Sequence, residues 1–132
     1  MKVLGQVSRF GVVGAIGFAV DGGSLWALVS GGIDPFFART ISFPLAVLTT
    51  WWLNRLWTFS TADKSRPKRQ LRLYFGVQLV GALSNFAVYS AVLMMIAPTP
   101  ANALGALAVG SFFGMFINFA GSRFFIFKPV RN

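Results

Sequence analysis

Three arginine residues stand where apolar segments of this sequence begin or end, and their side chains are suited to binding a phosphate group. Arg9 precedes the first apolar segment, and Arg55 and Arg123 close two later ones. A guanidinium group presents a planar fork of N–H donors that matches phosphate oxygens. We therefore predict an anionic headgroup site at one face of the protein, although arginine at such positions also contacts lipid headgroups and sets topology.

Asp21 is the second residue with conspicuous chemistry, because it lies inside an apolar segment. It follows Arg9 by twelve residues, which is ~18 Å along an α-helix and places it near the middle of a bilayer or somewhat beyond. An ionisable group at that depth is costly unless it meets a partner or a wet cavity. The candidate partners are Arg39 in the same half of the chain and Gln78 or Asn85 in the other half.

Composition excludes several kinds of chemistry. The chain has no histidine and no cysteine, which excludes imidazole and thiolate metal sites, Ser-His-Asp catalysis and disulfides. Its three acidic residues are aspartates far apart in the sequence, so a paired-carboxylate hydrolase is not expected. We therefore expect no catalytic residue, no metal and no cofactor, and a protein that is not an enzyme.

Composition also indicates a membrane protein. Of the 132 residues, 55% are hydrophobic and 16% aromatic, whereas only 11% are charged. This leaves too little polar surface for a soluble domain of this length. The net charge of +9 does not indicate nucleic acid, because the basic residues gather at the ends of apolar runs, as they do beside anionic lipids.

Four apolar segments are long enough to cross a bilayer as helices, which takes about twenty residues. They are residues 10–30, 36–59, 74–97 and 102–127. Eleven of the twelve basic residues lie on one side of these segments, and only Arg39 lies on the other. Because basic residues favour the cytoplasmic side, we predict an all-α membrane protein with four transmembrane helices and both termini in the cytoplasm. A dimer is expected to be parallel, since the bias specifies one orientation.

The second half of the chain repeats the pattern of the first. At an offset of 68 residues, 54–59 (Asn-Arg-Leu-Trp-Thr-Phe) aligns with 122–127 (Ser-Arg-Phe-Phe-Ile-Phe), and two stripes of small and polar residues align at every fourth position. The stripes are Ala38, Ser42, Ala46, Thr50 and Asn54, and Ala106, Gly110, Gly114, Asn118 and Ser122. We predict one domain, 1–132, made of two parallel helical-hairpin repeats at about 9–59 and 74–127, joined by a basic cytoplasmic loop at 60–73.

Spacing of four keeps each stripe on one helix face, where small residues let helix backbones approach closely in lipid. Their polar members are then suited to interhelical hydrogen bonds, namely Thr50, Asn54, Asn118 and Ser122. Two registers remain open for the first and third segments. An offset of 68 pairs Asp21 with Tyr89, whereas an offset of 64 pairs Asp21 with Asn85.

These features resemble the GtrA-like family of small four-helix membrane proteins. The resemblance covers nearly the whole chain, from the Arg-Phe-Gly-Val-Val-Gly run at 9–14 through Asp21 to the Arg-Phe-Phe-Ile-Phe run at 123–127. Its most specific part is Asn-Arg-x-Trp-Thr-Phe at 54–59. The family's closing motif often has Asn before its Arg, and this chain has Ser122 there.

The resemblance implies passage of a polyprenyl-phosphate-linked monosaccharide across the inner membrane of a bacterium or archaeon, for modification of cell-surface polysaccharide. Arg9, Arg55 and Arg123 would capture the phosphate, while polar side chains along the path would hold sugar hydroxyls. The path residues are Asp21, Arg39, Asn54, Gln78, Asn85 and Asn118. The expected partners are this sugar lipid, membrane lipids and a second copy of the chain, since four helices are few for a transport path.

Two other functions are compatible with the sequence. In the first, the protein is an accessory that recruits a membrane prenyl-phosphate glycosyltransferase, and Asp21 tolerates replacement. In the second, it is a small cation or drug exporter, which needs an acidic residue in the membrane. Asp21 supplies that residue, but such exporters usually depend on Glu and lack the arginines.

Overall fold

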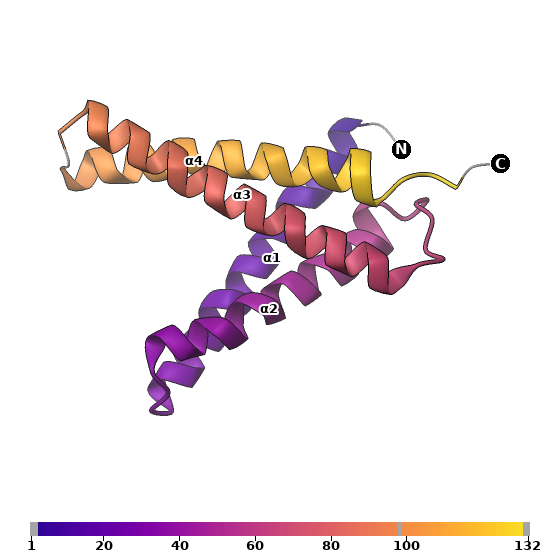
Figure 1. The fold of residues 1–132 in the computed structure, drawn as a ribbon, viewed down its shortest axis with the longest axis horizontal. Helices are drawn as coiled ribbons and strands as arrows, with labels where there is room; N and C mark the ends of the chain where they lie inside the picture. Colours follow the sequence, from indigo (N-terminus) through magenta and orange to yellow (C-terminus); the bar gives the residue numbers. More distant parts are fainter. Residues whose placement is uncertain (1–2, 98, 131–132) are drawn as a thin grey trace. The chain divides into compact units, whose positions relative to one another are not determined.

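The computed structural model describes residues 3–97 and 99–130, and this part of the chain is almost entirely helical. It contains four α-helices (Figure 1), namely α1 (Val3–Ser30), α2 (Pro35–Leu53), α3 (Pro67–Met95) and α4 (Pro100–Gly121). No strand occurs among these residues, which confirms the predicted all-α class. Two basic residues counted above, Lys2 and Arg131, lie outside the described residues.

Three helical stretches are long and apolar enough to cross a membrane. They are Val3–Ser30, Pro67–Met95 and Ala101–Ile126. α2 has only 19 residues, and Arg39, Pro44 and several hydroxyl side chains lower its hydropathy. The chain is therefore a multi-pass membrane protein, and among the four helices described α2 falls outside this set.

The turns before α2 and α4 are capped in the same way. The side chain of Asp34 accepts a hydrogen bond from the backbone N–H of Phe37 at 3.0 Å, and Thr99 accepts one from Asn102 at 3.2 Å. In both helices a proline follows the cap, where its missing N–H is no loss. The turn after α1 also needs Gly32, whose φ of 93° disfavours other residues. Local sequence therefore specifies where both helices begin.

α2 and α4 both end in a π-helical turn, η1 (Asn54–Thr58) and η2 (Ser122–Ile126). In each, the residue after the turn donates its backbone N–H to the carbonyl of the turn's first residue, at 2.8 Å in η1 and 2.7 Å in η2. The two turns start 68 residues apart. The wider turn rotates the following side chains relative to an α-helix, and both arginines of the repeated motif lie in it.

The chain divides into two compact units. Among the described residues, the first contains 3–67 and 129–130, and the second contains 68–97 and 99–128. Each unit is built on one helical hairpin, with α1 beside α2 and α3 beside α4 (Figure 1). In the first unit an antiparallel bridge between Ala62 and Pro129 attaches the chain's last described residues to the segment after η1.

In the first unit the small-residue stripe of α2 is buried. Ala38 and Ser42 are fully buried, and Ala46 is nearly so. Gly17 of α1 packs directly against the side chain of Thr50, so a Cβ atom at this glycine would overlap the Thr50 methyl group. The predicted stripe is thus the face of α2 that packs in the hairpin.

The second unit packs in the same way, with amide side chains against glycines. Asn118 of α4 lies against Gly81 of α3, where a Cβ atom would overlap the amide. A Cβ atom on Gly114 would lie 3.0 Å from the carbonyl oxygen of Gly81 and 3.2 Å from the Cβ of Asn85. A larger residue at either glycine would therefore require a neighbouring group to shift, because the two helices pack closely here.

Matching contacts determine the register of the repeat. The contact of Gly17 with Thr50 corresponds to that of Gly81 with Asn118. The two glycines are 64 residues apart, whereas Thr50 and Asn118 are 68 apart. The first and third helices therefore align at an offset of 64, and the second and fourth at 68.

The ring contacts at the ends of the hairpins obey the same register. Phe10 packs edge-on against Phe59 with ring centres 6.3 Å apart, and Tyr74 packs edge-on against Phe127 at 6.0 Å. Phe10 and Tyr74 are again 64 residues apart, and the two phenylalanines that follow the π-helical turns are 68 apart. Such edge-to-face pairs contribute about 0.5–1.5 kcal/mol beyond their burial.

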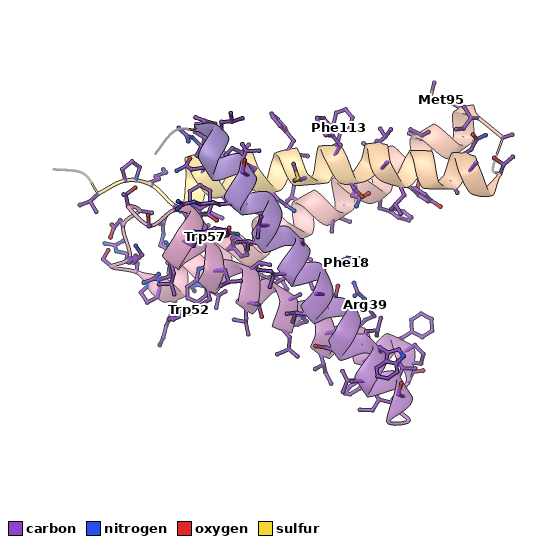
Figure 2. The ribbon with its side chains drawn as sticks, turned by 180° about the vertical axis from the view of Figure 1, so that it is seen from behind. Phe18, Arg39, Trp52, Trp57, Met95 and Phe113 are labelled. Carbon is purple, nitrogen blue, oxygen red and sulfur yellow. The ribbon has the colours of Figure 1, made fainter. Side chains whose placement is uncertain are left out.

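The outer surfaces of the helices are apolar. One large apolar side chain on each helix illustrates this in Figure 2: Phe18 of α1, Trp52 of α2, Met95 of α3 and Phe113 of α4 project away from the ribbon. Each of these side chains is about half-exposed or more. In water such surfaces would cause aggregation, whereas in a bilayer they face hydrocarbon. The exposed side chains therefore agree with the assignment to a membrane.

Candidate functional site

Arg9 and Arg55 both contact the segment that begins in η1. Arg9 donates a hydrogen bond from Nη1 to the carbonyl oxygen of Trp57 at 3.1 Å, and its guanidinium lies 5.3 Å from the centre of the Trp57 ring. Arg55 donates from Nη2 to the carbonyl oxygen of Lys64 at 2.8 Å and lies 5.4 Å from the Trp51 ring. Both arginine side chains are half-buried.

Stacking and backbone hydrogen bonds hold these two arginines in defined orientations. A cation over an indole ring gains about 0.5–2 kcal/mol, depending on how far it is desolvated. An oriented guanidinium loses less conformational entropy when it binds an anion than one that is mobile in solvent. This end of the first unit therefore presents two oriented guanidinium groups, with Trp51 and Trp57 as the rings that position them.

The third arginine of the predicted phosphate site belongs to the second unit. Arg123 is half-buried in η2, and its guanidinium lies 5.5 Å from the Phe124 ring. By the offset of 68, it occupies the place of Arg55 in the repeat. Two of the three predicted residues, Arg9 and Arg55, thus contact the same segment of the first unit. Arg123 holds the place of Arg55 in the second unit.

The loop after η1 contains one acidic residue, Asp63, which accepts a hydrogen bond within the loop. The backbone N–H of Ser65 donates to Asp63 Oδ1 at 2.9 Å. Hydrogen bonds from Ser65, with smaller contributions from the charges of Arg66 and Arg55, hold the pKa of Asp63 below its ordinary value. Asp63 is therefore ionised at neutral pH, and any stability that it contributes is lost only as the pH falls through this lowered pKa.

Asp21 and Arg39 form an ion pair between α1 and α2. The distance from Arg39 Nη1 to Asp21 Oδ1 is 2.6 Å, and the side chains are 48% and 23% exposed, respectively. The guanidinium also lies 5.9 Å from the Phe43 ring. Of the partners considered for Asp21, the structure shows Arg39. This pair and the Arg9 site lie toward opposite ends of the hairpin, as the labelled Arg39 and Trp57 show in Figure 2.

Asn54 lies in the interior of the first unit and is fully buried. Its Oδ1 accepts a hydrogen bond from Thr58 Oγ1 at 2.7 Å, between the first and last residues of η1. This bond stabilises the turn that carries Arg55. In the second unit the equivalent residues are Ser122 and Ile126, which cannot form such a bond.

The amides predicted for the polar path of the second unit lie on both helices of its hairpin. Gln78, Asn85 and Asn118 are each half-buried. Asn85 packs against Gly110 and Gly114, and at the offset of 64 it aligns with Asp21 of the first unit. The structure thus brings Asn85 and Asn118 to the α3–α4 contact.

Three buried polar side-chain atoms have no hydrogen-bond partner among the described residues. They are Ser42 Oγ, Asn118 Oδ1 and Ser122 Oγ. The sequence singled out Asn118 and counted Ser122 among the polar stripe residues suited to interhelical hydrogen bonds, whereas it presented Ser42 only as a member of its stripe. Buried polar atoms are usually paired, so these three are candidates for binding a ligand or water.

The unpaired hydroxyl of Ser122 can be tested by removing it. Ser122→Ala removes a fully buried polar group, so we expect the free energy of unfolding to rise by about 0.5–1 kcal/mol. Reversible unfolding of the full chain in bicelles measures this. Ser111→Ala, at an exposed position of the same helix, should change nothing. A loss of stability in Ser122→Ala would show that the hydroxyl has a partner in the membrane.

The fold and these side chains define a small all-helical, multi-pass membrane protein with a cationic end and polar residues between its helices. Residues 9–127 match the GtrA/DPMS transmembrane domain, and the chain belongs to this family, which confirms the resemblance seen in the sequence. A relative is the dolichol-phosphate mannosyltransferase of Pyrococcus furiosus, which is 32% identical over 98 residues. The match covers 72% of this chain but only 28% of the relative's length.

Proposed function

We propose that the protein carries a polyprenyl-phosphate-linked monosaccharide from the cytoplasmic leaflet of the membrane to the opposite leaflet. The observation that supports this most directly is the spacing of charged groups along the first hairpin. Arg9 and Arg55 lie at one end, and Asp21, paired with Arg39, lies ~18 Å further along α1. A phosphate headgroup would meet oriented cations where it enters and a second cation beyond the middle of the bilayer.

In this proposal all four helices cross the membrane, with both termini in the cytoplasm. α2 packs along α1, and the ion pair with Asp21 removes the isolated charge that would oppose insertion of Arg39. The basic segment 60–73 then lies on the cytoplasmic side between the repeats 9–59 and 74–127. The two hairpins are parallel repeats of one domain.

The remaining polar side chains would act on the sugar. Gln78, Asn85 and Asn118 offer amide donors and acceptors to its hydroxyls, and Arg123 offers a further cation to the phosphate. Asn54 contributes by stabilising η1, which carries Arg55. No residue has to make or break a covalent bond, so the protein acts as a carrier rather than an enzyme.

A parallel homodimer in the inner membrane of a bacterium or archaeon would complete the path. A four-helix chain presents few polar side chains to a headgroup, and a second copy doubles them. The uneven distribution of basic residues supports the same orientation for both copies.

The relative supports a second candidate function. The part of the mannosyltransferase that matches this chain makes up 28% of its length, so most of that protein has no counterpart in the match. A separate membrane domain of the same family could recruit or stabilise a prenyl-phosphate glycosyltransferase as an independent partner. In that case the helix surfaces would matter, and Asp21 would tolerate replacement.

Transbilayer movement of a labelled polyprenyl-phosphate sugar, in vesicles that contain only this protein, tests the first proposal. We expect Arg9→Gln and Arg55→Gln each to slow movement about tenfold, because each removes one charge-assisted bond to the phosphate. Arg66→Gln, in the exposed loop, is the matched control and should move lipid at the wild-type rate.

Movement that is absent from properly folded wild-type protein would exclude the carrier function. Addition of the glycosyltransferase and its sugar donor to the same vesicles would then test the second candidate. Equal movement in all four proteins would place the phosphate site elsewhere.

A further inference from the structure

We propose that Arg39 is a second phosphate site, at the far end of the first hairpin, and that Asp21 occupies it until a phosphate-bearing headgroup replaces the carboxylate. This inference rests on the proposed carrier function and names the site that would receive the headgroup after it has crossed. In this view the Asp21–Arg39 ion pair is a resting state in which an internal anion holds the cation in place.

The geometry of Arg39 suits an exchange of anions. The Arg39 side chain is 48% exposed, whereas the Asp21 side chain is 23% exposed, so the arginine is the more accessible partner of the pair. Its position near the Phe43 ring resembles the stacking of Arg9 on Trp57 at the other end of the hairpin. Both ends of the hairpin thus present a stacked guanidinium to a phosphate.

Few other charges can compete at this end of the hairpin. Between Phe10 and Asn54 the sequence contains only three charged residues, Asp21, Asp34 and Arg39. Asp34 accepts a hydrogen bond from the first turn of α2 and caps that helix. Arg39 is therefore the cation that this end of the hairpin offers to an anion.

A displaced Asp21 carboxylate needs a new hydrogen-bond donor in an environment of low dielectric constant, and Ser42 can supply one. The Ser42 hydroxyl is fully buried and has no partner among the described residues. In the second unit, Asn85 lies against Gly110. These residues are the equivalents of Asp21 and Ser42 in the register described above, so we expect the Ser42 hydroxyl on the face of α2 that opposes Asp21.

The exchange therefore leaves each anion with a hydrogen-bond donor. Before it, Arg39 donates to Asp21 and the Ser42 hydroxyl is unpaired. After it, Arg39 donates to the phosphate and Ser42 donates to Asp21. Because a charge inside a membrane protein is costly without a partner, the buried serine lowers the free energy of the displaced state.

Binding of a radiolabelled polyprenyl monophosphate, in nanodiscs of phosphatidylcholine, tests this site. The Arg9→Gln/Arg55→Gln/Arg123→Gln protein serves as the background, because it lacks all three arginines proposed above to bind the phosphate. In this background we expect Asp21→Asn to tighten binding about fivefold, since the competing carboxylate is gone. Arg39→Lys retains the charge but not the planar fork, and we expect it to weaken binding at least threefold.

Ser42 gives the decisive comparison. Ser42→Ala should weaken binding about threefold while Asp21 is present, and it should have no effect in the Asp21→Asn protein. Weaker or equal binding in Asp21→Asn, or an equal effect of Ser42→Ala with and without the carboxylate, would overturn the proposal. Competition by millimolar inorganic phosphate would show that the site recognises the phosphate group alone. Resistance to it would show that the lipid is also required.

These measurements concern binding and not movement, so they separate the two proposals. A carrier without this site would still move lipid and would bind no tighter after Asp21→Asn. A protein with the site but no carrier function would show the expected binding changes without transbilayer movement.

Discussion

Replacement of Gly110 by alanine is expected to lower the free energy of unfolding by about 1–3 kcal/mol, the usual range for overpacking a tight interface. A Cβ atom at this position would lie 2.5 Å from Oδ1 of Asn85 and 2.6 Å from its carbonyl oxygen. The amide side chain can rotate away. The carbonyl belongs to the backbone of α3, so one helix must shift along its packed face. Reversible unfolding of the full chain in bicelles measures the difference.

Gly105 provides a matched control on the same helix. A Cβ atom there would meet no described atom within 4 Å. Gly105→Ala should therefore be neutral or stabilising, by up to about 1 kcal/mol, because alanine favours the helix. If the two variants prove equally stable, α3 and α4 do not pack through Gly110 in the membrane.

The helix pairing could be predicted from the sequence because its signal repeats. Spacing of four put Ala38, Ser42 and Ala46 on one face, and the structure buries that face. The register of the first and third helices could not be predicted. A shift of four residues returns a helix to nearly the same face, so offsets of 64 and 68 preserve the same stripes. The contact of Gly17 with Thr50, matched by that of Gly81 with Asn118, distinguishes them, as do the ring contacts at the ends of the hairpins.

The π-helical turns had no such signal. A change from α-helical to π-helical hydrogen bonding depends on how the chain leaves the hairpin, and the Asn-Arg-Leu-Trp-Thr run is compatible with either. The turn nevertheless carries Arg55 and the carbonyl group of Trp57 that accepts from Arg9. The sequence could therefore identify these arginines, but not the indole rings that orient them.

The sequence could not predict which buried hydroxyl groups lack a hydrogen-bond partner, for a different reason. Whether a small polar residue is satisfied depends on its neighbour one turn away and not on its own type. Asn54 finds a donor in Thr58, whereas the equivalent pair in the second unit is Ser122 and Ile126. A periodic pattern treats both positions alike, and only the packed structure shows that one is satisfied and the other is not.

Replacement of Arg39, with Asp21 retained, is also expected to lower the free energy of unfolding by several kcal/mol. Arg39→Leu leaves the Asp21 carboxylate without its ion-pair partner at a position that is only 23% exposed. Removal of one partner of a fully buried pair costs about 3–5 kcal/mol, and partial exposure reduces this to about 2–3 kcal/mol here. The free energy of unfolding of the full chain in bicelles should fall by that amount, and transbilayer movement should fall with it.

The second unit shows which compensating change should restore stability. In the register established above, the equivalents of Asp21 and Arg39 are Asn85 and Leu107, and Leu107 is 49% exposed, much as Arg39 is. Asp21→Asn/Arg39→Leu gives the first hairpin the residues of the second, and we expect its stability to return to within about 1 kcal/mol of wild type. Movement should stay lost, because no cation remains at that end. A double variant as unstable as Arg39→Leu would mean that the arginine supports the fold by packing rather than by charge. A stable double variant that still moves lipid would show that Arg39 is not part of the transport path.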